Sequence, residues 1–481
     1  MSWAQTEPAE GTAEFGLVEA MLATARRHEL RLVLLWFGAF KNAASTYAPR
    51  WVRADRERFP RAVVDGSRRP AFTYPGGTPL PVLSVFSAEL READARAFER
   101  LIAHLAETDR DGTVAMVQVE NETGLLADSR DRCHLAAQAW AAPVPDRLLA
   151  HLPQAPAETS LAATLWAERD RPAGGSWAEV FGDDTRAGEV FMAWAFADYV
   201  GDLAARGKGI LEIPMYANAW LGPQPGQDEA GQYPSGGPAS GVLDVWRAAA
   251  PALDLLGPDI YVDDADGAMR TYAACAPPLF VPECRPSAGE LVRAIGTYGA
   301  LGWSAFGIDD GNPDGQVSAT LAHLTALEEA ILAARAGSRL AAVVLEPDAE
   351  ACEVDLGALR VTARGTLALM QRMLLDAGVA APPAEIVVPD ETAAHAVVPS
   401  PGEKRPFGLL IGEDDEAIVV IGQGLTLDVT AGGRPVEVDE VVELLLDGGR
   451  LVPGRVLNGD ERLRVLPTDR VGAVRIRLLR D

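Results

Sequence analysis

The strongest constraint in this chain is a rhythm of short apolar runs that alternate with amphipathic helical segments over residues 16–337. Neighbouring parallel strands need a long crossover, and a helix is the usual one, so the rhythm predicts a parallel sheet covered by helices. Strands are expected at 30–38, 112–122, 209–220, 258–262, 278–286 and 303–309. Helices are expected at 16–29, 87–108, 186–208, 243–257, 287–302 and 317–337. The predicted fold class is therefore α/β.

Polar residues at the strand ends distinguish between the two parallel architectures. Five expected strands carry polar or aromatic side chains at their carboxyl ends: Lys41 and Asn42, Asn121 and Glu122, Asn218 and Trp220, Tyr261, and Glu283. A doubly wound sheet uses the strand ends at its switch point, whereas a (β/α)8 barrel gathers every strand end at one face. No GxGxxG motif follows a strand either. We therefore predict a (β/α)8 TIM barrel as the catalytic domain over 1–337.

From about residue 338 the pattern changes to short β-type runs separated by Gly, Pro and Asp turns. The runs lie at 341–348, 352–363, 385–390, 407–431, 436–452 and 462–480, with one helical interruption at 366–378. This pattern predicts a β-rich accessory domain over 338–481 with a sandwich-like architecture.

Charge and cysteine content narrow the classes of function. The formal net charge of −26 argues against nucleic acid or an anionic membrane surface as partner, and it is compatible with a neutral sugar. Four scattered cysteines without a CxxC pair argue against a disulfide framework or a cysteine zinc site. The acidic loops 263–267 and 309–315 lack EF-hand spacing, so neither a metal nor a cofactor is expected. No apolar run reaches the roughly 18 residues of a membrane span, and residues 1–20 lack signal-peptide features, which favours the cytoplasm.

Two strand-end glutamates, Glu122 and Glu283, are the candidate catalytic pair. Glycoside hydrolysis needs two carboxyl groups, one that keeps its proton to act as general acid and one that stays ionised. Asn121, beside the first glutamate, is placed to hold the sugar 2-hydroxyl, and Glu120 is expected to support the site from below. The alternative is structural: Glu122 caps the next helix, and Glu283 pairs with Arg285 in a loop.

Six segments of the sequence resemble glycoside hydrolase family 35, the β-galactosidases, and within it the bacterial branch with a small β-rich C-terminal domain. These segments are EPAEG (7–11), VLLWFGAFKN (33–42), MVQVENETG (116–124), PMYANAW (214–220), GPDIY (257–261) and PLFVPECRP (278–286), in the order of the family. The resemblance implies a clan-A barrel, a retaining double displacement, and exo-acting removal of a terminal β-linked galactose.

The resemblance also implies roles for individual residues. It places the acid/base on Glu122 and the nucleophile on Glu283. Sugar hydroxyls would be bound by Glu7, Asn42, Asn121 and Asn218, Tyr261 would hydrogen-bond the nucleophile, and Trp303 would form an aromatic platform. For the aromatic and asparagine positions, packing at the barrel rim and turn formation are the structural alternatives.

The chain departs from the family pattern in three places. The segment WFGAFKN replaces the acidic motif of the better-known members, and Thr123 stands where most members carry an aromatic residue. WAQTEPAEG (3–11) resembles the end of the second barrel strand, so the first strand and helix would be missing, together with any upstream signal peptide. Two alternatives stay open: a related clan-A glycosidase acting on another sugar, such as a β-glucosidase or β-arabinosidase, and a non-catalytic carbohydrate-binding remnant of such a barrel. The sequence leaves the linkage, the aglycone and the oligomeric state undetermined.

Overall fold

The structure of the protein is a computed structural model that describes residues 1–66, 81–156, 158–379, 386–459, 461 and 465–479. By their internal contacts the residues fall into two compact units. The first comprises Met1–Ile260 and Thr271–Phe280, and the second comprises Tyr261–Arg270 and Val281–Asp481. The expected domain boundary between residues 337 and 338 stays a prediction.

The first sheet is parallel, and its strands follow the order of the chain, β1-β2-β3-β4-β5-β6. Its strands are β1 (Leu32–Lys41), β2 (Val114–Asn121), β3 (Met215–Trp220), β4 (Leu255–Ile260), β5 (Val281–Cys284) and β6 (Trp303–Ala305). Parallel strands with helical crossovers confirm the α/β class for this part of the chain. A closed eight-stranded barrel stays a prediction, because the described residues supply six strands to this sheet.

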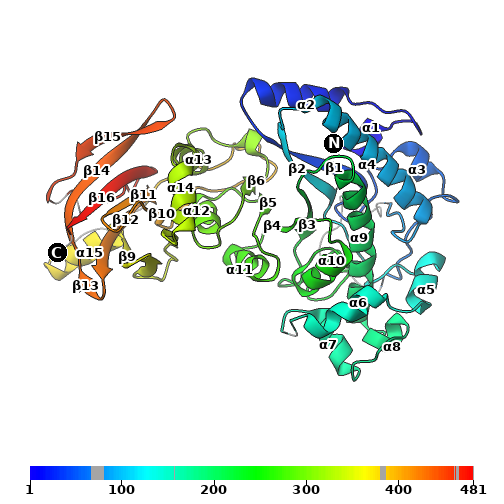
Figure 1. The fold of residues 1–481 in the computed structure, drawn as a ribbon. Coiled ribbons are helices and arrows are strands. Elements are labelled where there is room, and N and C mark those ends of the chain that lie inside the picture. The colour runs from blue at the N-terminus through cyan, green and yellow to red at the C-terminus, as the bar shows by residue number, and fades with distance from the viewer. Residues whose placement is uncertain (67–80, 157, 380–385, 460, 462–464, 480–481) are drawn as a thin grey trace. The chain divides into compact units, whose positions relative to one another are not determined.

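Two long helices, α4 (Ala88–Thr108) and α9 (Thr185–Lys208), lie beside strands β1 to β3 in Figure 1. Ser87 begins α4 by accepting a hydrogen bond from the Leu90 amide, and Asp184 begins α9 in the same way. The other helices of the first unit are α1 (Trp3–Thr6), α2 (Gly16–Arg27), α3 (Arg50–Ala54), α5 (His134–Ala141), α6 (Asp146–His151), η1 (Leu152–Gln154), α7 (Leu161–Glu168), α8 (Trp177–Phe181), η2 (Ser240–Val242) and α10 (Leu243–Ala249).

The core between the first strand and these helices is aromatic. The ring of Trp36 on β1 lies 5.7 Å from that of Phe98 on α4. Phe40 lies four residues further along β1, and its ring contacts those of Phe196 and Tyr199 of α9 edge-on, with ring centroids 5.2 and 5.4 Å apart. All five side chains are buried, and edge-to-face pairs add to the stabilisation from buried area. This packing fixes β1 against the helix layer.

The first residues of the chain lie beside β1. Ser2 forms a parallel bridge with Phe37, and the Phe37 amide donates a 2.8 Å hydrogen bond to the carbonyl of Met1. Ser2 also begins α1 in a capping box with Gln5. Met1 and Ser2 therefore lie alongside β1, whereas residues 3–6 of the segment that resembles a strand end form helix α1.

One predicted helix of the first unit is wrong in its second half. The expected helix 243–257 ends at Ala249 as α10, and residues 255–260 form strand β4. Pro251 cannot continue the helix because it lacks a backbone N–H and its ring clashes with the preceding turn. The apolar pair Leu255 and Leu256 fits both periodicities, and the sheet position decided between them.

The second unit contains two antiparallel sheets, with strand orders β15-β14-β16-β11-β10-β7 and β13-β12-β9-β8. Their strands are β7 (Leu340–Val344), β8 (Cys352–Leu356), β9 (Leu359–Gly365), β10 (Phe407–Gly412), β11 (Ala417–Gln423), β12 (Leu425–Ala431), β13 (Arg434–Pro435), β14 (Glu437–Asp447), β15 (Arg450–Val456) and β16 (Gly472–Leu479). The expectation that the chain after residue 338 consists mainly of short β-strands is therefore confirmed.

Both faces of the larger antiparallel sheet are covered. Leu410 of β10 packs into the core that both sheets share, whereas its neighbours Leu409 and Ile411 pack against the helices α12 (Ala288–Gly296), α13 (Gln316–Ala326) and α14 (Glu328–Ala336). Alternate residues of a strand point to opposite faces, so a strand covered on both sides is apolar throughout, as β10 is. The helices α12, α13 and α14, which were predicted as part of the barrel, thus cover one face of this antiparallel sheet.

After residue 260, two predictions are wrong, one helix was missed and one predicted helix is confirmed. The expected helix 317–337 is two helices, α13 and α14, that meet at Leu327 with a bend of 73°. Residues 265–275 form helix α11, which was not predicted. In the expected run 385–390, residues 386–390 form no strand, and residue 385 lies outside the described residues, as do 462–464 and 480 of the last run. The predicted helix 366–378 is present as α15 (Thr366–Asp376), and η3 (Ile308–Asp310) follows β6.

Among the described residues, no single helix is both long enough and apolar enough to cross a membrane. Only α13 and α14 taken together, with the bend between them, meet both criteria.

Candidate functional site

The chain turns sharply where β1 ends against the end of β2. Asn42 and Ala43 have φ angles of 52° and 53°, and Glu122 has a φ of 43°. The amides of Asn42 and Ala43 donate to the carbonyls of Asn121 and Glu122 at 3.2 and 3.1 Å. Left-handed backbone costs non-glycine residues about 1–2 kcal/mol each, and such strain concentrates at functional sites. The strained turn therefore marks this edge of the sheet as a candidate site.

A chain of hydrogen-bonded side chains, here called the strand-tip chain, crosses the ends of β1 to β4. Lys41 and Asn121 both donate to the Asn42 side-chain oxygen, at 2.8 and 2.7 Å. Asn218 donates to the side chains of Asn121 at 3.2 Å and Asp259 at 2.5 Å. Parallel strands place their carboxyl ends at one edge, which brings together residues up to 218 positions apart. Three predicted site residues, Asn42, Asn121 and Asn218, are therefore neighbours.

Glu122 is attached to this chain through its backbone. Its amide donates a 3.0 Å hydrogen bond to the side-chain oxygen of Asn218. Glu122 and Asn42 are half-buried, whereas Asn121 and Asn218 are each 3% exposed. The two buried amides thus hold the two more accessible groups, a carboxyl and an amide, at the rim. A carboxyl group beside hydrogen-bonding amides is suited to proton transfer next to a polyhydroxylated ligand.

In the second unit, the other predicted glutamate is held by a phenol. The Tyr261 hydroxyl donates a 2.5 Å hydrogen bond to Oε1 of Glu283, and both side chains are half-buried. The Tyr261 ring also contacts Phe306 edge-on at 6.3 Å. A short O–H···O hydrogen bond to one oxygen of a carboxyl group fixes the orientation of that group. Tyr261 and Glu283 are thus hydrogen-bonded to each other, and the role of Glu283 as a nucleophile stays a prediction.

The neighbours of Glu283 bear on the structural alternative for this residue. Arg285, its expected partner in that alternative, lies 3.1 Å from Asp263 in an exposed ion pair. Cys284 donates through its thiol to the carbonyl of Ser304 at 3.2 Å, and its side chain is buried. Arg285 therefore has a carboxylate partner other than Glu283.

Two further predicted residues have contacts that serve packing. Glu7 is 6% exposed, and its carboxylate accepts hydrogen bonds from Trp3 at 2.9 Å, Gly11 at 2.7 Å and Arg100 of α4 at 2.9 Å. These bonds anchor α1 on α4. Trp303 is half-buried and packs against the helix-covered core of the second unit. For both residues, the role in sugar binding stays a prediction.

Sequence reasoning missed Asp259 and Gln118. Asp259 is 3% exposed at the end of β4 and lies inside the segment GPDIY, which was quoted without assigning it a role. Gln118 donates to the Asn121 side chain at 2.8 Å and to the Glu120 carbonyl at 2.9 Å. A polar residue inside an apolar strand was the available signal in both cases, because a buried polar group needs a partner.

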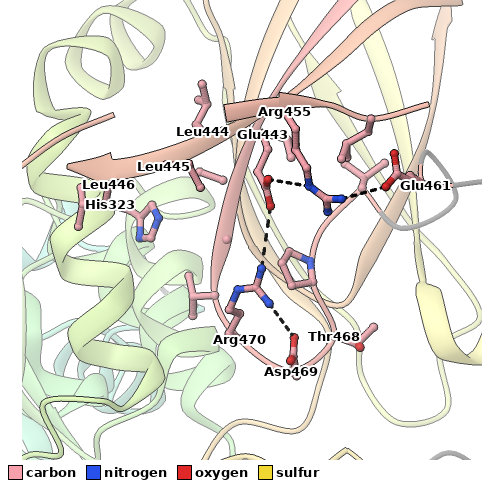
Figure 2. A pocket seen from close by; sticks show the side chains of 17 residues that line it. His323, Glu443, Leu444, Leu445, Leu446, Arg455, Glu461, Thr468, Asp469 and Arg470 are labelled. Carbon is pink, nitrogen blue, oxygen red and sulfur yellow. Dashed lines mark hydrogen bonds and ion pairs between the residues drawn. The ribbon is translucent and has the colours of Figure 1, made fainter. Parts of the chain in front are cut away.

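The second unit also contains a pocket of about 670 Å³ between α13 and strands β14 to β16 (Figure 2). Figure 2 shows Glu443 between two arginines; its carboxylate lies 3.1 Å from Arg455 and 3.9 Å from Arg470. Arg455 in turn contacts Glu461 at 2.9 Å, and Arg470 contacts Asp469 at 3.4 Å. The two arginines that line this pocket are therefore both held in ion pairs with its three carboxylates.

Within the described part of the chain, His, Cys, Asp and Glu residues form no group of three or more with the spacing of a metal site.

Comparisons with known proteins cover parts of the chain. Residues 317–466 match the model of a family described as "Domain of unknown function (DUF5597)". No curated protein matches the sequence. Among solved structures, that of a beta-galactosidase from Bacillus circulans sp. alkalophilus is similar over 63% of this chain and 44% of its own, with 13% identity and a TM-score of 0.37. This chain thus spans less than half the length of that protein, and a TM-score this low carries no argument about fold or activity.

Proposed function

We propose that this protein is a retaining glycoside hydrolase that removes a terminal β-linked galactose. The observation that carries the proposal is the hydrogen bond from Tyr261 to Glu283, because it orients a half-buried carboxylate at a strand end, as a nucleophile requires. The strand-tip chain beside Glu122 supports it, since amides and a lysine suit the hydroxyl groups of a sugar. The sequence resemblance supports the choice of galactose.

The proposed reaction has two steps. Glu122 gives its proton to the glycosidic oxygen while Glu283 attacks the anomeric carbon, so the aglycone leaves as an alcohol and a glycosyl ester forms on Glu283. Glu122, now ionised, then removes a proton from water, which attacks the same carbon and frees the Glu283 carboxylate. Two inversions give net retention. This chemistry requires the two carboxyl groups to approach to about 5–5.5 Å during catalysis.

Stereochemistry and substrate range test the reaction. We expect turnover of an aryl β-galactoside, with β-galactose as the first product in a proton NMR time course. An α-anomer appearing first would contradict the double displacement. Aryl β-glucoside and β-arabinoside, run in parallel, decide between galactose and another sugar. Sugar binding without turnover of any of the three would favour the non-catalytic remnant.

Substitutions test the assigned roles. Glu283→Gln should lower kcat roughly 10³-fold or more for every substrate, because no other group forms the ester. Glu122→Gln should slow substrates with poor leaving groups about 10²–10⁴-fold and activated dinitrophenyl substrates much less, because good leaving groups need little protonation. Glu212→Gln is the matched control, since Glu212 precedes β3 at the opposite end of the strand and is exposed.

Azide separates the two roles chemically. With Glu283→Ala, azide should occupy the vacated space and give the α-glycosyl azide. With Glu122→Ala, azide should attack the glycosyl ester and give the β-glycosyl azide, since one further inversion follows the first. Near-normal turnover in both glutamine variants would refute the assignment.

A further inference from the structure

Strand β1 bulges just before it delivers Lys41 and Asn42 to the strand-tip chain. It pairs with β2 in continuous register from Val33 to Trp36, which lies opposite Val119, and the next pair is Lys41 with Asn121. Between these pairs β1 advances five residues while β2 advances two. Residues in such a bulge lose their ladder partners, so their amides need other acceptors.

Two buried carboxyl groups supply those acceptors. The Ala39 amide donates to both Asp94 of α4 and Glu120 of β2, each at 3.0 Å. The Phe40 amide donates to the second oxygen of Glu120 at 2.7 Å. Both acids are 0% exposed. The bulge is therefore held by side chains from a helix and from the neighbouring strand.

Asp94 collects further donors from around it. Trp36 donates its indole N–H at 3.0 Å and Tyr199 of α9 donates its hydroxyl at 2.9 Å, both to Asp94. The guanidinium of Arg91 lies 5.5 Å from the centroid of the Tyr199 ring. Asp94 thus has the donors that an anion needs, whereas Glu120 accepts from backbone alone.

One proton shared by the two acids explains this asymmetry. Two carboxyl groups that accept from the same N–H are too close for both to ionise in an apolar core. Burial raises the pKa of both, and the Asp94 charge raises that of Glu120 further, whereas the hydrogen bond from Glu120 lowers that of Asp94. The proton therefore belongs on Glu120, which donates it to the Asp94 carboxylate.

We propose that Asp94 and Glu120 act as a positioning pair, which closes the bulge of β1 and thereby fixes Asn42 and the strand-tip chain for the ligand. The inference rests on the proposed function only for the nature of that ligand. Neither acid is assigned contact with it. The bulge ends one residue before Lys41, so a shift of the Phe40 amide is transmitted directly to the Asn42 turn.

Amide hydrogen exchange, resolved to Ala39 and Phe40 by mass spectrometry with electron-transfer fragmentation, tests the pair directly. Glu120→Ala should accelerate exchange at both amides about 10–100-fold, because both lose an acceptor. Glu120→Gln should stay within about threefold of wild type, since its oxygen accepts from Phe40, its NH₂ group replaces the shared proton, and the Ala39 amide keeps Asp94 as its acceptor. Glu189→Gln, a buried acid on α9 away from the bulge, is the control and should leave both amides unchanged.

The location of the proton gives a second readout. Asp94→Asn should accelerate exchange at Ala39 more than Glu120→Gln does, because an amide offers one oxygen to donors that need two. The reverse order, or unchanged exchange in Glu120→Ala, would overturn the proposal. If Glu120→Ala does not fold, the order of the two amide variants still decides the question.

Kinetics links the pair to the site. In an active enzyme, Glu120→Ala should lower kcat/KM for an aryl β-galactoside at least tenfold, and Glu120→Gln should restore most of it. Loss of activity without faster exchange at Ala39 and Phe40 would refute positioning through the bulge. Wild-type protein without turnover, but with the expected exchange pattern, would refute the proposed function and leave the positioning pair intact.

Discussion

Gly38 tests how tightly the buried acid pair is packed. A Cβ atom at this position would lie 2.7 Å from Oδ1 of Asp94 and closer still to the Glu120 carboxylate and the Trp36 indole nitrogen. None of these atoms is the end of a solvated, flexible side chain, so Gly38→Ala must displace the pair from its donors. Two disrupted buried hydrogen bonds at about 1–3 kcal/mol each, together with overpacking, suggest a loss of about 3–5 kcal/mol in the free energy of unfolding.

Urea unfolding followed by tryptophan fluorescence measures this loss, and Trp36 reports from the displaced site itself. With a urea slope of about 3 kcal/mol per molar, the midpoint of the transition of the first unit should fall by about 1 M or more. Gly16→Ala is the control: nothing lies within 4 Å of its Cβ position and it begins α2, so its midpoint should hold or rise slightly. If the urea midpoint of Gly38→Ala stays within about 0.2 M of the wild-type midpoint, the acid pair relaxes freely and the packing argument is refuted.

Two further predictions concern single groups. Burial raises the pKa of Glu189 to about 7 from 4.5, so the folded protein keeps a proton that the unfolded chain releases above pH 4.5. The stability gained from that proton is complete below pH 4.5 and falls by about 3 kcal/mol as the pH rises to 7. Glu189→Gln has no carboxyl group to titrate, so its stability should not fall in this way. Its urea midpoint relative to wild type should therefore rise between pH 4.5 and pH 7 and then level off. If the two midpoints change with pH in parallel, the raised pKa of Glu189 is contradicted. Tyr261→Phe should lower kcat on an aryl β-galactoside about 10–100-fold through loss of the bond to Glu283, whereas Tyr298→Phe, which removes a similar bond to Asp266, should not; a Tyr261→Phe kcat within twofold of wild type would count against the nucleophile.

Periodicity predicted most of the local structure. The helices α4 and α9 begin and end within a residue or two of their expected bounds. Each has an N-cap residue, and α4 has an apolar face whereas α9 is buried on most sides. The series of short β-strands after residue 338 was predicted from the Gly, Pro and Asp turns between the apolar runs. Periodicity failed where one apolar stretch fits two structures, as at residues 255–260, and where a helical pattern continues across a bend, as at Leu327.

For the candidate site, the sequence alone supplied the residue types at the strand ends. Asn42, Asn121 and Asn218 were predicted together because parallel strands end at one edge, and the structure joins them by hydrogen bonds. Asp259 could not be assigned a partner from the sequence, since its contact with Asn218 spans 41 residues and depends on the pairing of β3 with β4.

The tertiary structure alone revealed the acid pair under the site. A carboxylate at position 94, on the apolar face of α4, was a visible irregularity, and Glu120 at a strand end was another. Nothing in the sequence joins them, because their meeting depends on a bulge that forms only when β1 pairs with β2 and both pack on α4 and α9. Residue types and periods are properties of the chain itself, whereas burial and the sharing of a proton exist only once distant segments have excluded water between them.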